Sequence, residues 1–165
     1  MPGRKIKFFI RTVELKDCRS LWYWRNHKEA RRWSFRPQKI PYAIHCRWFQ
    51  KTMGDPKKTI YVVCDATGQR VGQTRFERLK NKAIISVTLN PRYYNKGIGN
   101  HLIRRTSHKY LKDFPNIKKI VAEINQNHIA SHKAFYKANY SLDKKTVKLG
   151  KKIFILTYQR KPANA

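Results

Sequence analysis

Two glycines at positions 97 and 99 mark the part of this 165-residue chain best suited to bind a reacting molecule. Glycine has no side chain, so a ligand can approach the backbone closely at Gly97 and Gly99. A helix that begins there also has first-turn amides without an intrahelical acceptor. These amides, the positive end of the helix dipole and the charge of Lys96 all favour a phosphate-type anion. The turn is therefore predicted to bind a phosphorylated molecule.

The residues on either side of the glycines predict a strand, a turn and a helix in uninterrupted order. Residues 83–89 (AIISVTL) are apolar and largely β-branched, and Asn90-Pro91 ends this strand. Apolar residues then recur every three or four positions between 98 and 114, which indicates an amphipathic helix. The G-x-G pattern alone fits a ligand-free helix start equally well, and its spacing matches neither a P-loop nor a dinucleotide-binding loop.

The sequence LNPRYYNKGIGN at 89–100 resembles the acetyl-CoA-binding motif of the GNAT N-acetyltransferases, V-x-P-x-x-[RQ]-x-x-G-x-[GA]. The resemblance implies that the strand ending at Leu89 lies beside the pantetheine arm of acetyl-CoA, and that the turn binds the pyrophosphate through backbone amides. Tyr94 occupies the position at which the family usually has Arg or Gln. The residues implied to bind acetyl-CoA are Leu89, Tyr94, Asn95, Lys96, Gly97, Ile98, Gly99, Asn100 and, at the start of a later helix, Asn127.

A second resemblance concerns the acceptor side. The motifs W-R-N-H at 24–27 and H-x-R-W-F at 45–49 are similar to the GNAT subgroup that acetylates the amino group of nucleotide-activated amino sugars, including pseudaminic-acid pathway enzymes. This similarity implies that Arg25, Asn26 and His45 line the acceptor pocket. A structural role for Arg25 and Asn26, holding the loop between the first two helices, is an equal alternative. The tryptophans at 22, 24, 33 and 48 fit core anchors better than ligand stackers.

Two residues are candidates for proton transfer. The stretch 125–141 resembles the family helix N-x-x-[AS]-x-x-x-[YF]-x-K-x-G-[FY], whose tyrosine protonates the departing thiolate. The register places that tyrosine at position 134 or at Phe135, and Tyr136 is adjacent. Asn139 stands at the family glycine, which asparagine can replace because it tolerates a left-handed backbone. Glu77 is the candidate base, although for both Glu77 and Glu123 an ion pair with a nearby cation is the more ordinary use.

Charge is the least ordinary feature of the composition. The chain has 38 Lys and Arg against nine Asp and Glu, a formal charge of +29. Such a charge implies anionic partners, either a nucleotide-linked acceptor or a polyanion such as nucleic acid. A basic surface unrelated to catalysis remains an alternative. The rival functions are a protein- or ribosome-associated N-acetyltransferase and a non-enzymatic, basic nucleic-acid-binding module.

Several other classes of protein fit the sequence poorly. The three cysteines are odd in number and lack a C-x-x-C pair, which favours free thiols in a reducing compartment. His128 and His132 have helical spacing but no nearby third ligand, so no metal site is predicted. No apolar run reaches the ~18 residues of a membrane span, and no signal or transit peptide is indicated, so a cytoplasmic location is expected. The sequence leaves the oligomeric state open.

The predicted fold is a single α/β domain of GNAT type over residues 1–165, with a mixed, mostly antiparallel sheet flanked by helices. Strands are predicted at 6–13, 59–65, 70–78, 83–89 and 117–124, with a final hairpin at 146–158. Helices are predicted at 14–29, 43–53, 97–114 and within 125–141. Because a helix separates the strands at 83–89 and 117–124, these two should be parallel and joined by a right-handed crossover. The resemblance implies that they splay apart and admit the pantetheine arm.

Overall fold

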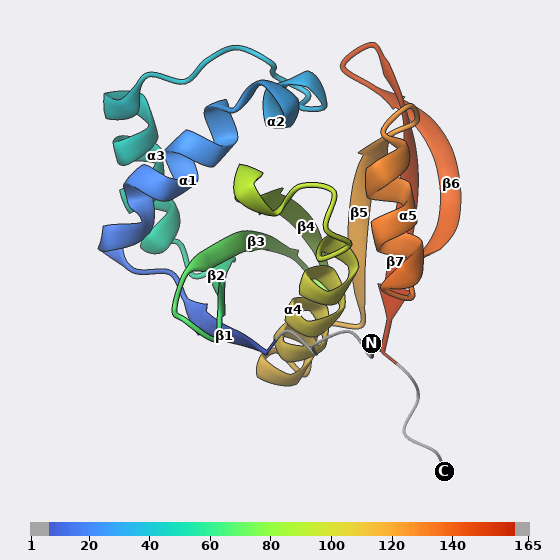
Figure 1. Ribbon diagram of the computed structural model, residues 1–165. Helices are drawn as coiled ribbons and strands as arrows, with labels where there is room; N and C mark the ends of the chain where they lie inside the picture. The colour runs from blue at the N-terminus through green and yellow to red at the C-terminus, as the bar shows by residue number, and fades with distance from the viewer. Residues whose placement is uncertain (1–6, 161–165) are drawn as a thin grey trace, which may run out of the picture.

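The computed structural model describes residues 7–160, which form one seven-stranded sheet with helices on both faces (Figure 1). The strand order is β1-β2-β3-β4-β5-β7-β6, and only β4 and β5 are parallel neighbours. The predicted mixed, mostly antiparallel α/β fold is therefore confirmed. The strands are β1 (Phe8–Thr12), β2 (Lys58–Asp65), β3 (Arg70–Leu79), β4 (Lys82–Leu89), β5 (Lys119–Asn125), β6 (Ser141–Lys148) and β7 (Lys151–Gln159). The helices are η1 (Leu15–Asp17), α1 (Cys18–Asn26), α2 (Lys28–Arg32), α3 (Tyr42–Met53), η2 (Pro91–Tyr93), α4 (Gly99–Asp113) and α5 (Ile129–Lys137).

Alternating side chains divide the sheet into two faces. On the front face, which α1 and α3 cover, Ile60 and Val62 pack with Trp24 and Phe49. On the back face, which α4 and α5 cover, Phe76 stacks on Tyr110 with ring centroids 4.1 Å apart. Successive side chains of a strand point to opposite faces of the sheet. Residues of β3 and β4 can therefore reach α1 and α3 only when their side chains lie on the front face.

The two parallel strands separate partway along their length. Their register runs from Lys82 opposite Lys119 to Ile85 opposite Ala122, and no later β4–β5 pair is present in the described residues. Residues 86–89 of β4 and 123–125 of β5 thus diverge, which Figure 1 shows at the upper ends of these strands. We call this feature the strand opening. Its unpaired edges leave backbone donors and acceptors free for another extended molecule.

Two predicted elements were wrong in their boundaries. The helix predicted at 14–29 is divided into η1, α1 and α2, because His27 has an extended backbone (φ −59°, ψ 140°). The His27 ring accepts a hydrogen bond from the Glu29 amide and so begins α2 as its N-cap. The last hairpin starts at Ser141 instead of 146. All eight residues of β6 are exposed, so hydrophobic alternation cannot mark this edge strand.

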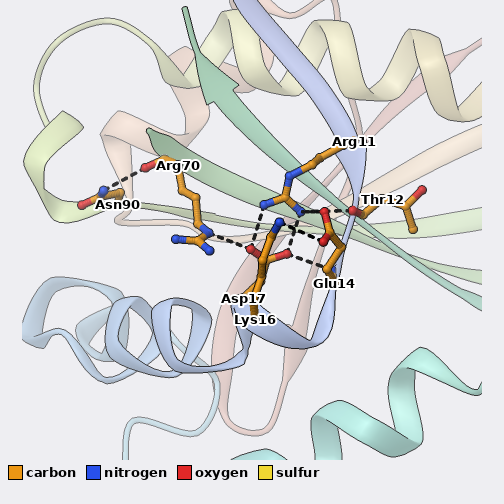
Figure 2. A network of polar contacts seen from close by, with 7 residues as sticks. All are labelled: Arg11, Thr12, Glu14, Lys16, Asp17, Arg70 and Asn90. Carbon is orange, nitrogen blue, oxygen red and sulfur yellow. Dashed lines mark hydrogen bonds and ion pairs between the residues drawn. The ribbon is translucent and has the colours of Figure 1, made fainter. Parts of the chain in front are cut away.

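A buried ion cluster joins the start of α1 to the sheet. Asp17 is fully buried, and its carboxylate accepts hydrogen bonds from Arg11, from Arg70 and from the Glu14 amide (Figure 2). The Arg70 carbonyl in turn accepts from the Asn90 side chain at 2.9 Å. This cluster therefore connects β1, α1 and β3 with the residue that ends β4.

Helices α1 and α3 are joined by polar contacts as well as by packing. His45 is buried on α3, and its Nε2 lies 3.1 Å from the carbonyl oxygen of Cys18 on α1. The Sγ atoms of Cys18 and Cys46 are 3.6 Å apart as free thiols, and Cys64 is a buried free thiol in β2. Within residues 7–160, no helix has the length and apolar character needed to cross a membrane.

Candidate active site

The turn after β4 has the backbone geometry of an anion-binding concavity. Asn95 and Gly97 have left-handed φ angles of 59° and 68°, and Ile98, the N-cap of α4, is right-handed. Such alternation turns neighbouring amides toward one point. Ile98 provides no side-chain cap, and the hydrogen bond nearest the helix start runs from the Leu102 amide to the Ile98 carbonyl. The first-turn amides before Leu102 therefore have the arrangement that suits a pyrophosphate, and pyrophosphate binding at this turn stays a prediction.

The two glycines of the turn serve different purposes. A Cβ atom at Gly97 would meet no atom within 4 Å among the described residues, so this position faces open space. A Cβ atom at Gly99 would lie 3.5 Å from the Cβ of Ala134 and 3.9 Å from Leu89 Cδ1. A methyl group at Gly99 would therefore make ordinary packing contacts with α5 and β4, so this position faces protein and not open space. Only Gly97 has the open side that the sequence analysis expected of both.

Neighbouring residues hold the turn in place. The Asn90 side chain accepts from the Arg92 amide, and Tyr93 donates its hydroxyl to Asp65 at 2.8 Å. Lys96 is exposed, with its ammonium 5.4 Å from the centre of the Tyr93 ring. Tyr94 lies edge-on to His27, and burial raises the pKa of the Tyr94 phenol. The turn at residues 95–98 is thus connected to the β2–β3 hairpin and to the junction of α1 and α2.

Replacement of Gly97 with valine tests this assignment. The branched side chain would fill the open side of the turn, so CoA should bind more weakly by about 2 kcal/mol or more, roughly 30-fold. Calorimetric titration with CoA measures the change.

Gly68 provides a matched control for backbone strain. It has a left-handed φ of 83°, also faces open space, and lies in the β2–β3 turn. Gly68→Val should lose similar stability and keep its affinity for CoA. Equal affinities in the two folded variants would contradict a pyrophosphate site at Gly97.

Polar side chains gather on the front face at the strand opening. Arg75 and Ser86 are register partners on β3 and β4, with Arg75 Nη2 3.4 Å from Ser86 Oγ. Glu123 is the residue of β5 just past the last β4–β5 pair, and it forms an ion pair with Lys148. The carboxylate of Glu123 is half-buried. It is therefore a carboxylate at the opening itself.

Glu77, the base candidate from the sequence, lies two residues beyond Arg75 on β3, farther from the strand opening. It is opposite Ile84, which is still paired with Val121 of β5. Glu77 thus belongs to the closed part of the sheet, beyond the strand opening. Its position favours Glu123 over Glu77 for contact with a molecule in the opening.

The predicted acceptor residues divide into two groups. Asn26 uses its whole side-chain amide on the main chain of Ile40, donating to the carbonyl and accepting from the amide. His45 contacts Cys18, and burial lowers its pKa, which favours the neutral ring. Both residues therefore hold the acceptor-side helices and their loop together, which is the structural alternative left open above for Asn26.

Arg25 remains available for a ligand. Its Nη2 donates to Ser34 Oγ and to the Arg36 carbonyl, whereas its Nη1 is buried and has no partner among the described residues. Burial lowers the pKa of Arg25, and the positive charges of Arg31 and Arg75 lower it further. Neither Arg25 nor Arg75 has a described carboxylate within ion-pair distance.

Arg75 is a candidate site residue that the sequence analysis missed. Its guanidinium lies 5.2 Å from the centre of the Trp48 ring, and burial lowers its pKa. The alternation of β3 places Gln73 and Glu77 on the same front face. The alternation of β3 can be read from the sequence, but it does not show which face of the strand meets the acceptor.

Helix α5 does not bring a tyrosine hydroxyl to a buried position. Phe135 is buried against Tyr140, whereas Tyr136 is 44% exposed and lies beside His132. Asn127 is exposed just before α5. Asn139 has a left-handed φ of 69°, which confirms its expected replacement of a helix-ending glycine. An acid role for Tyr136 stays a prediction, and this exposure does not support it.

The segment after α2 reaches across to the other side of the opening. Trp33 stacks on His128 with ring centroids 4.6 Å apart, and Lys151 donates to the Ser34 carbonyl. Phe35 packs against apolar residues of β5 and β7. Burial and then the charge of His132 lower the pKa of His128 to about 4. His128 therefore contributes to packing, and residues 7–160 contain no cluster of three or more metal-binding side chains.

Several solved structures share this fold, among them two described as acetyltransferases. The spermidine N-acetyltransferase of Vibrio cholerae, in complex with CoA and spermine, has a TM-score of 0.81 and 16% identity, over 92% of this chain and 95% of that one. The aminoglycoside acetyltransferase AAC(6')-Ib with coenzyme A has a TM-score of 0.80 and 15% identity, over 93% and 95%. A domain from Methanocaldococcus jannaschii has a TM-score of 0.79 and 20% identity, over 94% and 100%. At identities of 15–20%, these TM-scores show a shared fold alone.

The family itself is established by sequence. No curated protein sequence matches the chain significantly. The family described as the acetyltransferase (GNAT) domain matches residues 7–141, most of the chain. That match includes the turn at residues 95–98 and the two strands, β4 and β5, that form the strand opening. The chain therefore belongs to the GNAT family of N-acetyltransferases.

Proposed function

We propose that this enzyme transfers the acetyl group of acetyl-CoA to the primary amine of an anionic small molecule, specifically an amino sugar linked to a nucleotide. The observation that carries the proposal is the pair Arg25 and Arg75, two half-buried arginines without a described carboxylate partner, of which Arg25 has a buried Nη1 that makes no described hydrogen bond. A buried charge without a partner is costly. Guanidinium groups match the geometry of phosphate, so a phosphorylated acceptor would supply the missing partner.

The charge of the site disfavours the acceptors of the structural relatives. Polyamines and aminoglycosides are polycations, and their recognition calls for several free carboxylates. Of the two carboxylates on the front face near the opening, Glu123 is paired with Lys148 and Glu77 adjoins Arg75. A net charge of +29 opposes the approach of a polycation further.

The proposed reaction uses the chain's residues for binding and for one proton transfer. The turn amides near Gly97 hold the pyrophosphate, and the free edges of the strand opening hold the pantetheine amides. Glu123 takes a proton from the acceptor's ammonium, directly or through water. The amine nitrogen then bonds to the acetyl carbon as the carbon–sulfur bond breaks, and the electron pair leaves with sulfur. The proton that the nitrogen loses in forming the amide passes through water to the thiolate. A thiol pKa near ~8.5 makes the thiolate a fair leaving group, so no tyrosine acid is required.

The acceptor assignment predicts a selective effect of Arg75. Arg75→Met should raise the KM of a nucleoside-diphosphate-linked amino sugar about tenfold or more, because a charge-assisted hydrogen bond is lost. The KM of acetyl-CoA should stay near its wild-type value. Steady-state kinetics with each substrate varied in turn measures both constants.

Arg78 is the matched control for this prediction. It lies on the same strand but on the opposite face, where its guanidinium is 5.6 Å from the centre of the Phe114 ring. Arg78→Met should leave the acceptor KM unchanged. The same assay should be run with spermidine and kanamycin as acceptors. If wild-type enzyme acetylates either polycation with the higher kcat/KM, the proposed acceptor class is wrong.

A further inference from the structure

The helical segment from residue 18 to 54 is rich in aromatic and basic side chains. It contains all four tryptophans and nine Lys or Arg, against the single carboxylate of Glu29. The acetyl-transfer site uses few of these cations. Most of the others lie on α1, α2 and the α2–α3 loop, and Arg47 and Lys51 lie on α3.

A groove crosses the outer surface of the segment 18–54. It has a volume of about 610 Å³ and lies between α1, α2 and the segment 39–41. We call it the outer groove. None of its lining residues belongs to the sheet or to the turn at residues 95–98, so the outer groove is distinct from the strand opening. The residues that give it its character are Trp22, Tyr23, Lys28, Arg31, Lys39 and Ile40.

The walls of the outer groove are fixed by hydrogen bonds. Trp22 Nε1 donates to the Ile40 carbonyl at 2.7 Å. Arg31 donates to the carbonyls of Asn26 and Pro37 at 3.0 and 3.1 Å. These bonds hold the α2–α3 loop against α1 without using the groups that face outward. The groove is therefore preformed, which lowers the entropic cost of binding.

The groups left free are one aromatic ring and two ammonium groups. Tyr23 is 61% exposed, and Lys28 and Lys39 are exposed without an ion pair to any described carboxylate. A stripe continues beyond the groove, where Tyr42 meets Trp22 edge-on and Arg19 lies 4.9 Å from the centre of the Tyr42 ring. Cations and aromatic rings are thus present both in the outer groove and next to it.

We propose that the outer groove binds single-stranded nucleic acid. Lys28 and Lys39 would neutralise phosphates and the exposed ring of Tyr23 would stack on a base, the combination used in sequence-tolerant single-strand binding. An acidic peptide would use the cations but not the rings. A membrane surface would be met by protruding apolar side chains instead of a concave wall. The charge of the outer groove favours a polyanion that also carries flat aromatic groups.

Fluorescence anisotropy with a labelled 12-nucleotide uridine RNA, measured at several salt concentrations, tests the proposal. Wild-type affinity should fall steeply with salt. The double variant Lys28→Gln, Lys39→Gln should bind more weakly and reduce the log–log salt slope by about 0.7 for each lysine. Tyr23→Ala should weaken binding about tenfold with an unchanged salt slope, because stacking carries no charge.

Matched controls separate the outer groove from general attraction. Arg104→Gln, Arg105→Gln removes two exposed charges from α4, and Tyr136→Ala removes an exposed ring from α5. Both should bind RNA as the wild type does. Losses equal to those of the groove variants would overturn the proposal. So would a nucleoside diphosphate that binds as tightly as the 12-mer, or anionic phospholipid vesicles that outcompete it.

Acetyl transfer should be measured on the same proteins. The lysine and Tyr23 variants should keep wild-type acetylation kinetics, since none of these residues faces the strand opening. RNA binding and acceptor choice are read out separately, so failure of one proposal leaves the other measurable. An acetylation defect that parallels the RNA defect would overturn the separation of the two sites.

Discussion

Replacement of Glu123 with glutamine is expected to lower kcat for acetyl transfer about 10²-fold or more, with little change in the KM of acetyl-CoA. Glutamine keeps the shape of the side chain and removes only its capacity to accept a proton. Glu123 stands just beyond the last β4–β5 pair, where the thioester is proposed to meet the amine. Rapid-quench or steady-state measurement of acetylated product gives kcat directly.

Two further variants test whether the effect belongs to the Glu123 carboxylate. Lys148→Met removes the ion-pair partner and keeps the carboxylate, so a large loss of kcat there would point to the ion pair instead. Glu77→Gln tests the base predicted from the sequence, which lies in the closed part of the sheet. If Glu77→Gln loses activity and Glu123→Gln does not, Glu77 is the base.

Tyr136→Phe tests the other predicted catalytic group. A hydroxyl that protonates the thiolate would be worth about 10²-fold in kcat. Because Tyr136 is largely exposed and Phe135 takes the buried position of the helix, we expect an unchanged kcat. A rate loss without a change in KM would restore the acid role of Tyr136.

The sequence predicted best where one local pattern determines both structure and chemistry. The apolar strand at 83–89, the turn at Gly97 and the amphipathic helix behind it appear as expected in β4, the left-handed backbone and α4. The parallel crossover to β5 followed from the intervening helix alone. Local signals of this kind need no knowledge of distant contacts.

The acceptor side was harder to predict because its contacts span long sequence separations. Asn26 bonds to Ile40, His45 to Cys18, and Arg25 to Ser34 and Arg36. A polar residue in a motif looks the same whether it binds a substrate or a distant carbonyl. The division of the predicted helix at His27 has a related cause, since a histidine side chain caps α2 where no proline or glycine marks a break.

Substitution of Asp17 with asparagine should cost about 2–3 kcal/mol of unfolding free energy, because it weakens the charge-assisted hydrogen bonds that the partly exposed Arg11 and Arg70 donate to the buried carboxylate. Arg11 donates to both carboxylate oxygens at 2.7 and 2.8 Å, and Arg70 donates at 2.6 Å (Figure 2). Urea denaturation measures the loss. Asp143→Asn is the control, because Asp143 is exposed on β6 and makes no described ion pair, and it should change stability by less than about 0.5 kcal/mol.

The same cluster predicts how stability depends on pH. Burial alone would raise the pKa of Asp17, but the hydrogen bonds from Arg11, the Glu14 amide and Arg70 outweigh it and lower the pKa from 3.8 to about 2. A depressed pKa stabilises the folded state above the unfolded value, and that contribution is lost as pH falls through the folded value. Wild-type protein should therefore lose about 2 kcal/mol through this group between about pH 4 and pH 2. Asp17→Asn has no such group, so its stability difference from wild type should narrow over this range, and a constant difference would show that Asp17 titrates normally.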